Sequence, residues 1–319
     1  KQIMLSRSTQ QKTVDVGFDD SHQLGSQLSD VRKKTTRIIS VTTIQRASFL
    51  VCSLALINEA IVPHFNAPND SRNLDGASGK VRLPWIYKGF KDVSDPRESV
   101  IDDDGKDAPV FWHIHKSGGS TMKEIFGACY RMCMAHSVPG LDHETEIAKL
   151  PNANYANVDL ATSRGIKRAK DLGLAQSGIA QVMVTPEVYK VASIFDESHR
   201  GKVFALFRHP IDRFVSKFNY LSYATWERTY DPLKANMTLE EYARSDLGEE
   251  SNWMVRMITN NRRTEVTRED LEVAKEFIRK KVLVGLLSEI EASVERFEKF
   301  FHWRHTSDWM RQEMCKDER

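Results

Sequence analysis

The sequence predicts an α/β domain with a parallel β-sheet flanked by helices, preceded by a poorly structured N-terminal region. Short apolar runs at residues 110–114, 179–185 and 202–207 have the length and the β-branched and aromatic content of buried strands. Each run is followed by apolar residues at helical spacing, and no internal repeat is evident. Strands that alternate with helices favour a parallel sheet, which binds ligands at the carboxyl ends of its strands.

Bulk composition excludes several classes of protein. The chain has 319 residues, with 46 Lys and Arg against 44 Asp and Glu, so its net charge of +2 does not indicate a nucleic-acid partner. Four cysteines do not make a disulfide scaffold in a chain of this size. Cys129 and Cys133, followed by His136, are interpreted as residues of a helix core rather than as metal ligands, and no metal is predicted.

Residues 1–106 differ from the remainder. They comprise a polar tail, an apolar segment at residues 47–62 with a basic flank, and a Pro- and Asp-rich stem. The apolar segment is either a single-pass signal anchor or a buried helix, since it is shorter than the roughly 20 residues of a spanning helix. Glycosylation sequons begin at Asn69 and Asn236, so an anchor would predict a glycoprotein with a lumenal C-terminal part.

The most informative stretch is residues 109–133, which reads as a strand, a basic glycine-rich turn and an amphipathic helix. Glycines let the backbone approach a ligand closely, and a helix N-terminus offers free N–H groups to an anion. The strand, turn and helix thus predict a P-loop-like phosphate site, although a plain strand–helix turn with a solvated lysine is the alternative. The turn consists of Lys116, Ser117, Gly118, Gly119, Ser120 and Thr121.

The turn is not a Walker A sequence, because Lys116 precedes both glycines. It resembles the 5′-phosphosulfate loop of sulfotransferases, commonly Pro-Lys-Ser/Thr-Gly-Ser/Thr-Ser/Thr. His115 stands where that family has proline. The agreement extends over Lys116, Ser117, Gly118, Ser120 and Thr121.

A second motif follows the run at residues 202–207. Arg208 comes at the predicted strand end, Pro210 suits the first helical position, and Ser216 lies two helical turns further on. An arginine fixed at a strand end suits bidentate phosphate recognition, although an ordinary strand–helix junction gives the same pattern.

Together the two motifs resemble those of sulfotransferases that use 3′-phosphoadenosine-5′-phosphosulfate (PAPS). That family holds the donor's 3′-phosphate with an Arg and a Ser spaced as Arg208 and Ser216 are, and His209 replaces its usual Asp. The chain looks closest to the membrane-anchored Golgi carbohydrate sulfotransferases of the uronyl and heparan sulfate 2-O group. The residues at 252–256 and 282–289 are similar to the end of that family's domain, which would span residues 107–305 and leave 306–319 as a tail.

The resemblance implies transfer of a sulfuryl group from PAPS to a carbohydrate hydroxyl, in the Golgi lumen and without a metal. Lys116 would neutralise the leaving phosphate, and Ser117 to Thr121, Arg208 and Ser216 would bind the donor. The general base is expected to be Glu187, which follows the run at 179–185 and replaces the histidine of the 2-O group. His143 and Glu144 are the reserve candidates, and His136 and His199 are further candidates.

Further signals concern packing. Capping boxes at residues 238–241 and 267–270 predict helix starts, and apolar stripes at 269–281 and 289–303 predict core faces. Four tryptophans could line a sugar site, although burial in the core is the commoner role: Trp226, Trp253, Trp303 and Trp309.

Two other functions fit the same residues less well. One is a catalytically silent nucleotide- or carbohydrate-binding module of the same fold. The other is a P-loop nucleotide kinase, which would need a Walker A lysine and an acidic strand end. The sequence does not indicate the acceptor or the oligomeric state.

Overall fold

The structure, a computed structural model, describes residues 81–93, 106–138, 147–150, 153–227, 230–245 and 251–303. The chain divides into units 1–47 and 48–319, and every described residue belongs to the second. The apolar segment 47–62, the C-terminal tail and the reserve bases His143 and Glu144 lie outside the described residues. No helix in the described ranges is long and apolar enough to cross a membrane.

One seven-stranded sheet organises the described residues, with strand order β3-β4-β2-β5-β1-β6-β7. All neighbouring strands are parallel except the edge pair β3–β4. The predicted α/β fold with a mainly parallel sheet flanked by helices is therefore confirmed. The strands are β1 (Ala108–Trp112), β2 (Cys133–Ala135), β3 (Ile147–Leu150), β4 (Ala153–Ala156), β5 (Val182–Thr185), β6 (Gly201–Phe207) and β7 (Val282–Leu286).

The helices begin where the sequence signals predict. Pro210 occupies the first turn of its helix, and Thr238 and Thr267 both form complete capping boxes. The α-helices are α4 (Gly119–Glu124), α5 (Ser163–Asp171), α6 (Leu174–Ser177), α7 (Val188–Val191), α8 (Pro210–Leu221), α9 (Pro232–Ala235), α10 (Leu239–Arg244), α11 (Trp253–Thr259), α12 (Arg268–Lys281) and α13 (Ile290–Phe301). Shorter turns are η2 (Trp85–Gly89), the π-helical η3 (Ile125–Cys129), η4 (Ala192–Ile194) and η5 (Leu287–Glu289).

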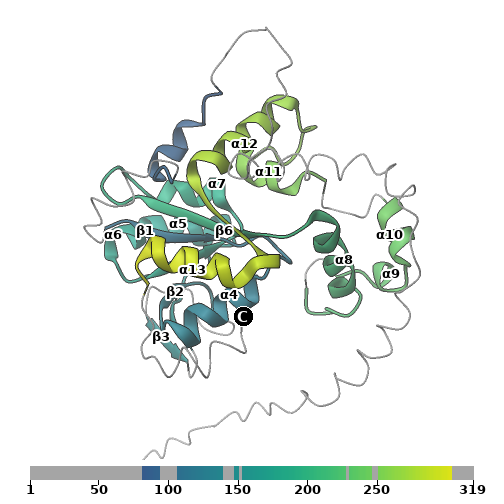
Figure 1. The fold of residues 1–319 in the computed structure, drawn as a ribbon, viewed down its shortest axis with the longest axis horizontal. Coiled ribbons are helices and arrows are strands. Elements are labelled where there is room, and N and C mark those ends of the chain that lie inside the picture. The colour runs from purple at the N-terminus through teal and green to yellow at the C-terminus, as the bar shows by residue number, and fades with distance from the viewer. Residues whose placement is uncertain are drawn as a thin grey trace, which may run out of the picture. The chain divides into compact units, whose positions relative to one another are not determined.

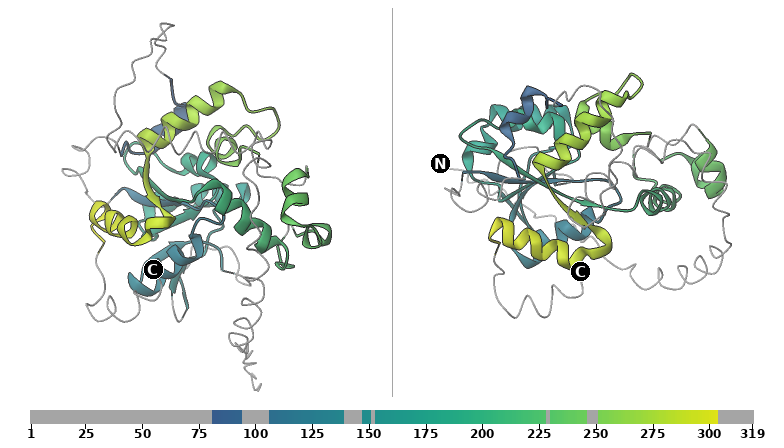
Figure 2. Two further views of the ribbon diagram at one scale, coloured as in Figure 1. Left: turned by 45° about the vertical axis from the view of Figure 1, so that its right-hand side comes forward. Right: turned by 45° about the horizontal axis from the view of Figure 1, so that its top comes forward.

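Hydrophobic clusters cover both faces of the sheet, because side chains alternate along each strand. On β1, Val110 and Trp112 join the cluster that includes residues of α5, α7, α11 and α12, whereas Phe111 joins the cluster of α4, η3 and α13. Figure 1 shows these two helical layers, and the right-hand view of Figure 2 shows the sheet between them. The apolar stripes of α12 and α13 are buried as predicted, on opposite faces.

The predicted helical stripe through Cys133 is wrong. The helix ends at Cys129, and Arg131 adopts a left-handed conformation (φ 54°) that turns the chain into β2, where Cys133 lies. Cys129 is disulfide-bonded, whereas Cys133 is buried and free. The helical spacing of apolar residues does not reveal the turn at Arg131 or the state of each cysteine.

Two segments for which the sequence predicts no helix or strand contribute to the folded unit. Residues 137–178 supply β3, β4, α5 and α6, elements too short to give a clear periodic pattern. Tyr87 and Phe90, from the expected stem, are 1% exposed and pack against Phe277. The sheet therefore gains a cover from residues 81–93, ahead of the predicted domain start.

Candidate functional site

The loop after β1 combines left-handed backbone with close packing. The His113 N–H donates to the Thr185 carbonyl at 2.8 Å, and Lys116 and Gly118 then have φ values of 62° and 81° before α4 begins at Gly119. A left-handed residue other than glycine costs roughly 1–2 kcal/mol. The fold therefore maintains a strained conformation at Lys116, which is typical of functional loops.

Glycine is necessary at position 119 because the His113 ring packs against it, and not because of its backbone angles. A Cβ atom at Gly119 would lie 2.0 Å from Nε2 of His113, so only glycine fits against this ring. Burial, helped by His115 and Lys123, lowers the pKa of His113 to about 3. The imidazole is therefore uncharged at neutral pH.

The hydroxyl groups of the loop differ in their surroundings. Ser117 is 1% exposed, and its Oγ has no hydrogen-bond partner among the described residues. Ser120 is exposed and Thr121 partly buried in the first turn of α4. A buried hydroxyl without a partner normally costs 1–3 kcal/mol, so it is a feature that a bound ligand would relieve.

Arg208 and Lys116 come together, although 91 residues separate them. Arg208 follows β6, the neighbour of β1, and its Nη1 donates to the Lys116 carbonyl at 3.1 Å. Burial lowers the pKa of the Lys116 ammonium, and the positive charge of Arg208 lowers it further, while Glu227 opposes this. Two cations held at one loop make a site that favours an anion.

Helix α8 presents a matching face to the same lysine. The Nζ of Lys116 lies 4.0 Å from the ring centroid of Tyr220, a cation–π contact. Ser216 is partly buried and precedes Tyr220 by four residues, so both lie on one face of α8. Of the predicted donor residues, Lys116 and Arg208 are joined by a hydrogen bond at the loop, and Ser216 lies in the second turn of α8.

Glu187 is held in place by two cations. Its N–H donates to Thr185 Oγ1 at 3.0 Å, and its carboxylate is 12% exposed. The Oε2 atom pairs with Lys190 Nζ at 3.2 Å and with Arg262. In the described part of the chain, Oε1 takes part in no hydrogen bond or ion pair, so one carboxylate oxygen is fixed and the other is available.

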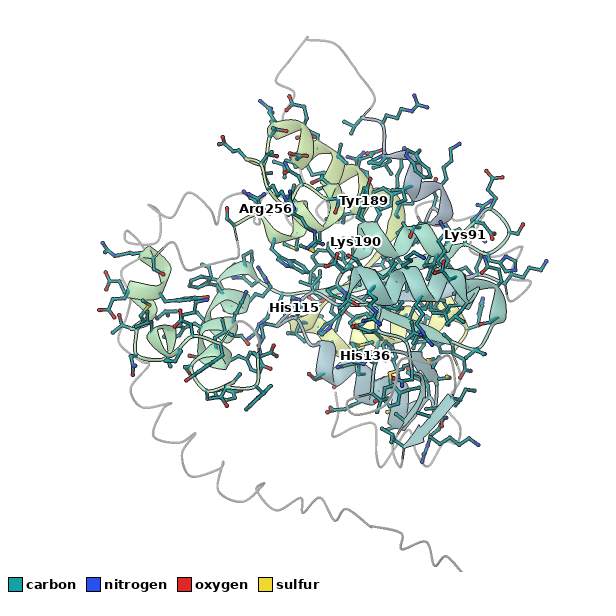
Figure 3. All side chains as sticks on the ribbon, turned by 180° about the vertical axis from the view of Figure 1, so that it is seen from behind. Lys91, His115, His136, Tyr189, Lys190 and Arg256 are labelled. Carbon is teal, nitrogen blue, oxygen red and sulfur yellow. The ribbon has the colours of Figure 1, made fainter. Side chains whose placement is uncertain are left out.

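The histidines named as bases occupy different edges of the sheet. His136 follows β2 at the carboxyl edge, where its Nδ1 lies 2.7 Å from the Ser137 carbonyl and burial lowers its pKa. His199 precedes β6 at the opposite edge and contacts Asp196. Figure 3 labels His115 and His136, from the carboxyl edge, and Lys91, which pairs with Asp107 at the amino end of β1.

Sequence reasoning overlooked several neighbours of the predicted site. His115 was noted only as a departure from the family motif, yet its ring packs 5.2 Å from Trp253, which stacks on Trp112. Tyr220 and Arg262 received no role, because each meets its partner only through the tertiary fold. The spacing of Tyr220 from Ser216 was the one available signal.

A hollow lined by charged residues of both signs lies at α5, whose Ser163 contacts Lys190, a partner of Glu187. This hollow of about 580 Å³ is lined by residues that include Arg164, Lys167 and Arg168. Ser163, in the first turn of α5, accepts a hydrogen bond from Lys190 at 2.9 Å. Acidic Asp159 and Asp171 line the same hollow, so the surface is of mixed charge.

Comparisons of the chain with protein-family models, with curated proteins and with solved structures find no match. Within the described ranges, no group of three or more His, Cys, Asp or Glu side chains is placed to hold a metal ion.

Proposed function

We propose that the chain is a sulfotransferase that moves a sulfuryl group from PAPS to a hydroxyl group of a carbohydrate. The observation that carries the proposal is the contact between Arg208 and the Lys116 loop. A loop lysine and a strand-end arginine, at the carboxyl ends of adjacent parallel strands, suit a nucleotide that carries phosphate at both its 5′ and 3′ positions.

The residues around the loop fit such a donor. Gly118 adopts the left-handed conformation that glycine allows, and the buried Ser117 hydroxyl lacks a partner among the described residues. The first N–H groups of a helix have no acceptors within that helix. These donors, with Lys116, would bind a phosphosulfate, while Arg208 and Ser216 would bind the 3′-phosphate.

The chemistry then needs positioning, charge neutralisation and a base. When bound, PAPS supplies an activated sulfuryl group whose leaving group is a phosphate. Lys116 would neutralise the charge that develops on that phosphate, as cations do in phosphoryl transfer. Glu187 would accept the hydroxyl proton on Oε1, while Arg262 and Lys190 hold Oε2 and fix the carboxylate.

A location in the Golgi lumen, with the chain anchored through residues 47–62, is part of the proposal. Asn236 of the second sequon is exposed, so it is accessible to a glycan. A glycosidase that shifts the mobility of the protein expressed in cells would support this location, and a soluble cytosolic distribution without glycan would contradict it.

The direct test is a screen of acceptors with sulfur-labelled PAPS. The protein is incubated with polysaccharides, glycoproteins, lipids and small alcohols, with Lys116→Ala as the control. Label transferred by the native protein and not by the variant supports the enzyme. Binding of the donor without transfer to any acceptor would instead favour a silent binding module of the same fold, and hydrolysis of ATP that depends on magnesium would favour a kinase.

A further inference from the structure

Three aromatic side chains gather beyond the C-terminal end of α8. The ring centroids of Tyr220, Tyr223 and Trp226 lie 5.7, 6.3 and 6.1 Å apart in the three pairings. Tyr223 is 59% and Trp226 68% exposed, whereas Trp112 is fully buried. We call Tyr220, Tyr223 and Trp226 the aromatic platform.

Hydrogen bonds hold the platform in one arrangement. The Nε1 of Trp226 donates to the Tyr220 hydroxyl at 3.3 Å, and that hydroxyl donates to Glu227 Oε1 at 2.5 Å. The side chains are therefore fixed while two of the rings remain exposed to solvent. Clustered, exposed apolar surface of this kind adds little to stability and marks an interaction site.

The platform is continuous with the proposed donor site. The Lys116 ammonium lies 4.0 Å from the centroid of the Tyr220 ring. The same ring also packs edge-on against the rings of Tyr223 and Trp226. A molecule resting on Trp226 would therefore lie one ring away from the lysine expected to act on the leaving group. This continuity favours the acceptor as the occupant over an unrelated partner protein.

The polar groups at its edge indicate the chemistry of that occupant. Glu227 and the Tyr220 hydroxyl can exchange hydrogen bonds with hydroxyl groups, while the exposed ring faces suit an apolar surface. A pyranose ring combines an apolar C–H face with hydroxyl groups around its edge. The negative charge of Glu227 disfavours a sugar carboxylate or sulfate at the same place.

We propose that the aromatic platform binds the acceptor, with Tyr223 and Trp226 stacking on an uncharged pyranose unit next to the hydroxyl that is sulfated. This inference rests on the proposed function and deepens it, since it names the class of sugar. The adenine of the donor is the competing occupant, because a base can stack on the same faces.

The experiment compares Trp226→Ala and Tyr223→Ala with two matched controls. Trp226→Phe retains an aromatic face, and Trp85→Ala removes a tryptophan that is 78% exposed on η2, away from the platform. Each protein is assayed for transfer from labelled PAPS to neutral hexasaccharides of β-linked glucose, galactose and N-acetylglucosamine. Binding of adenosine 3′,5′-bisphosphate is measured in parallel by calorimetry.

We expect Trp226→Ala to raise KM for a neutral hexasaccharide about tenfold, the loss of one stacking contact, with bisphosphate affinity unchanged. Trp85→Ala should stay within about threefold of the native protein, and Trp226→Phe should fall between the native protein and Trp226→Ala, because it retains an aromatic face but loses the hydrogen bond to Tyr220. An unchanged KM in Trp226→Ala, a loss of bisphosphate affinity in that variant, or no transfer to any neutral hexasaccharide would each overturn the inference. Failure of the native protein to bind the bisphosphate would instead overturn the proposed function.

Discussion

The two ends of the parallel strands differ in how their polar groups are satisfied. At the amino ends, Lys91 and Asp107 pair at 3.1 Å with only 12% and 11% of their side chains exposed, and Asp107 also accepts from the Arg200 N–H at 3.0 Å. At the carboxyl ends, two cations share one loop, a serine hydroxyl is buried without a partner in the described chain, and Lys116 has a left-handed backbone.

This difference suggests that polar residues at the amino ends stabilise the fold, whereas those at the carboxyl ends are suited to bind a ligand. The pairs at the amino ends link the segments that precede β1 and β6 with the segment after η2, and their charges and hydrogen bonds are satisfied without a ligand. Strained backbone and unmatched charge at the carboxyl ends lower stability unless a ligand compensates for them. The comparison therefore predicts that substitutions at the two ends have opposite effects on activity and stability.

The largest effect on activity is expected at Glu187. Glu187→Gln retains the shape and removes the proton acceptor, so turnover should fall by roughly 10²–10⁴ while the affinity for adenosine 3′,5′-bisphosphate is unchanged. Single-turnover assays with saturating donor measure the chemical step. Near-normal turnover in Glu187→Gln would transfer the role of the base to His143, Glu144 or His136.

Lys116→Ala should lower turnover by roughly 10²–10³, because it removes the charge that stabilises the leaving phosphate. The melting temperature should stay level or rise, since the variant also relieves the proximity of two cations. Thermal unfolding and kinetics on the same preparation test both statements. A variant that unfolds early and retains turnover would assign Lys116 to stability and remove the contrast between the two ends.

Lys91→Ala is the matched lysine substitution at the amino end. It leaves Asp107 buried without its cation, and the free energy of unfolding should fall by about 3 kcal/mol. The folded fraction should bind the bisphosphate as the native protein does. Denaturant unfolding and calorimetry measure these quantities, and a specific loss of bisphosphate affinity would contradict the division.

Gly119→Ala should weaken bisphosphate binding about tenfold, because the new Cβ meets the His113 ring and shifts the loop. Adding His113→Ala should restore most of the affinity, since the second change vacates the clashing volume. The coupling between the two positions is read from a double-mutant cycle. If the changes in bisphosphate affinity of the two single variants simply add in the double variant, the loss in Gly119→Ala does not come from contact with the His113 ring.

The stability of the fold should also depend on pH, through His113. His113 has a pKa of about 3 when folded and an ordinary value near 6.5 when unfolded, so the unfolded chain binds more protons between these values. Stability is therefore complete above about pH 6.5 and declines as the pH falls towards 3. We expect the free energy of unfolding to fall by about 3 kcal/mol between pH 7 and pH 4 on this account, and this part of the loss should disappear in His113→Gln. An unchanged slope in that variant would contradict the burial of the ring.

The sequence predicts the central fold better than its edge. β1, β5, β6 and β7 are continuous apolar runs that suit strands buried on both faces, so their pattern is clear. β2, β3 and β4 have only three or four residues each, which is too short for a recognisable alternation of apolar residues. In addition, the helical spacing of apolar residues in α4 and η3 extends into β2, which hides the start of that strand.

The candidate site divides in the same way. Lys116 and Arg208 were predicted because each sits in a local motif at a strand end. The ring of Tyr220 beneath Lys116 and the pairing of Arg262 with Glu187 join residues 104 and 75 positions apart, which only the packed structure reveals. Sequence motifs therefore indicated the donor side of the site, and the tertiary fold was needed for the groups that orient it.

The central claim is that the loop after β1 and the start of α8 together recognise a nucleotide with a 3′-phosphate. Calorimetry of the native protein with adenosine 3′,5′-bisphosphate and with AMP tests it most directly. The bisphosphate should bind roughly ten- to a hundredfold more tightly, because its 3′-phosphate adds charged contacts to Arg208 and Ser216, and Arg208→Ala should remove that preference. Equal affinity of the native protein for the two nucleotides would contradict the account.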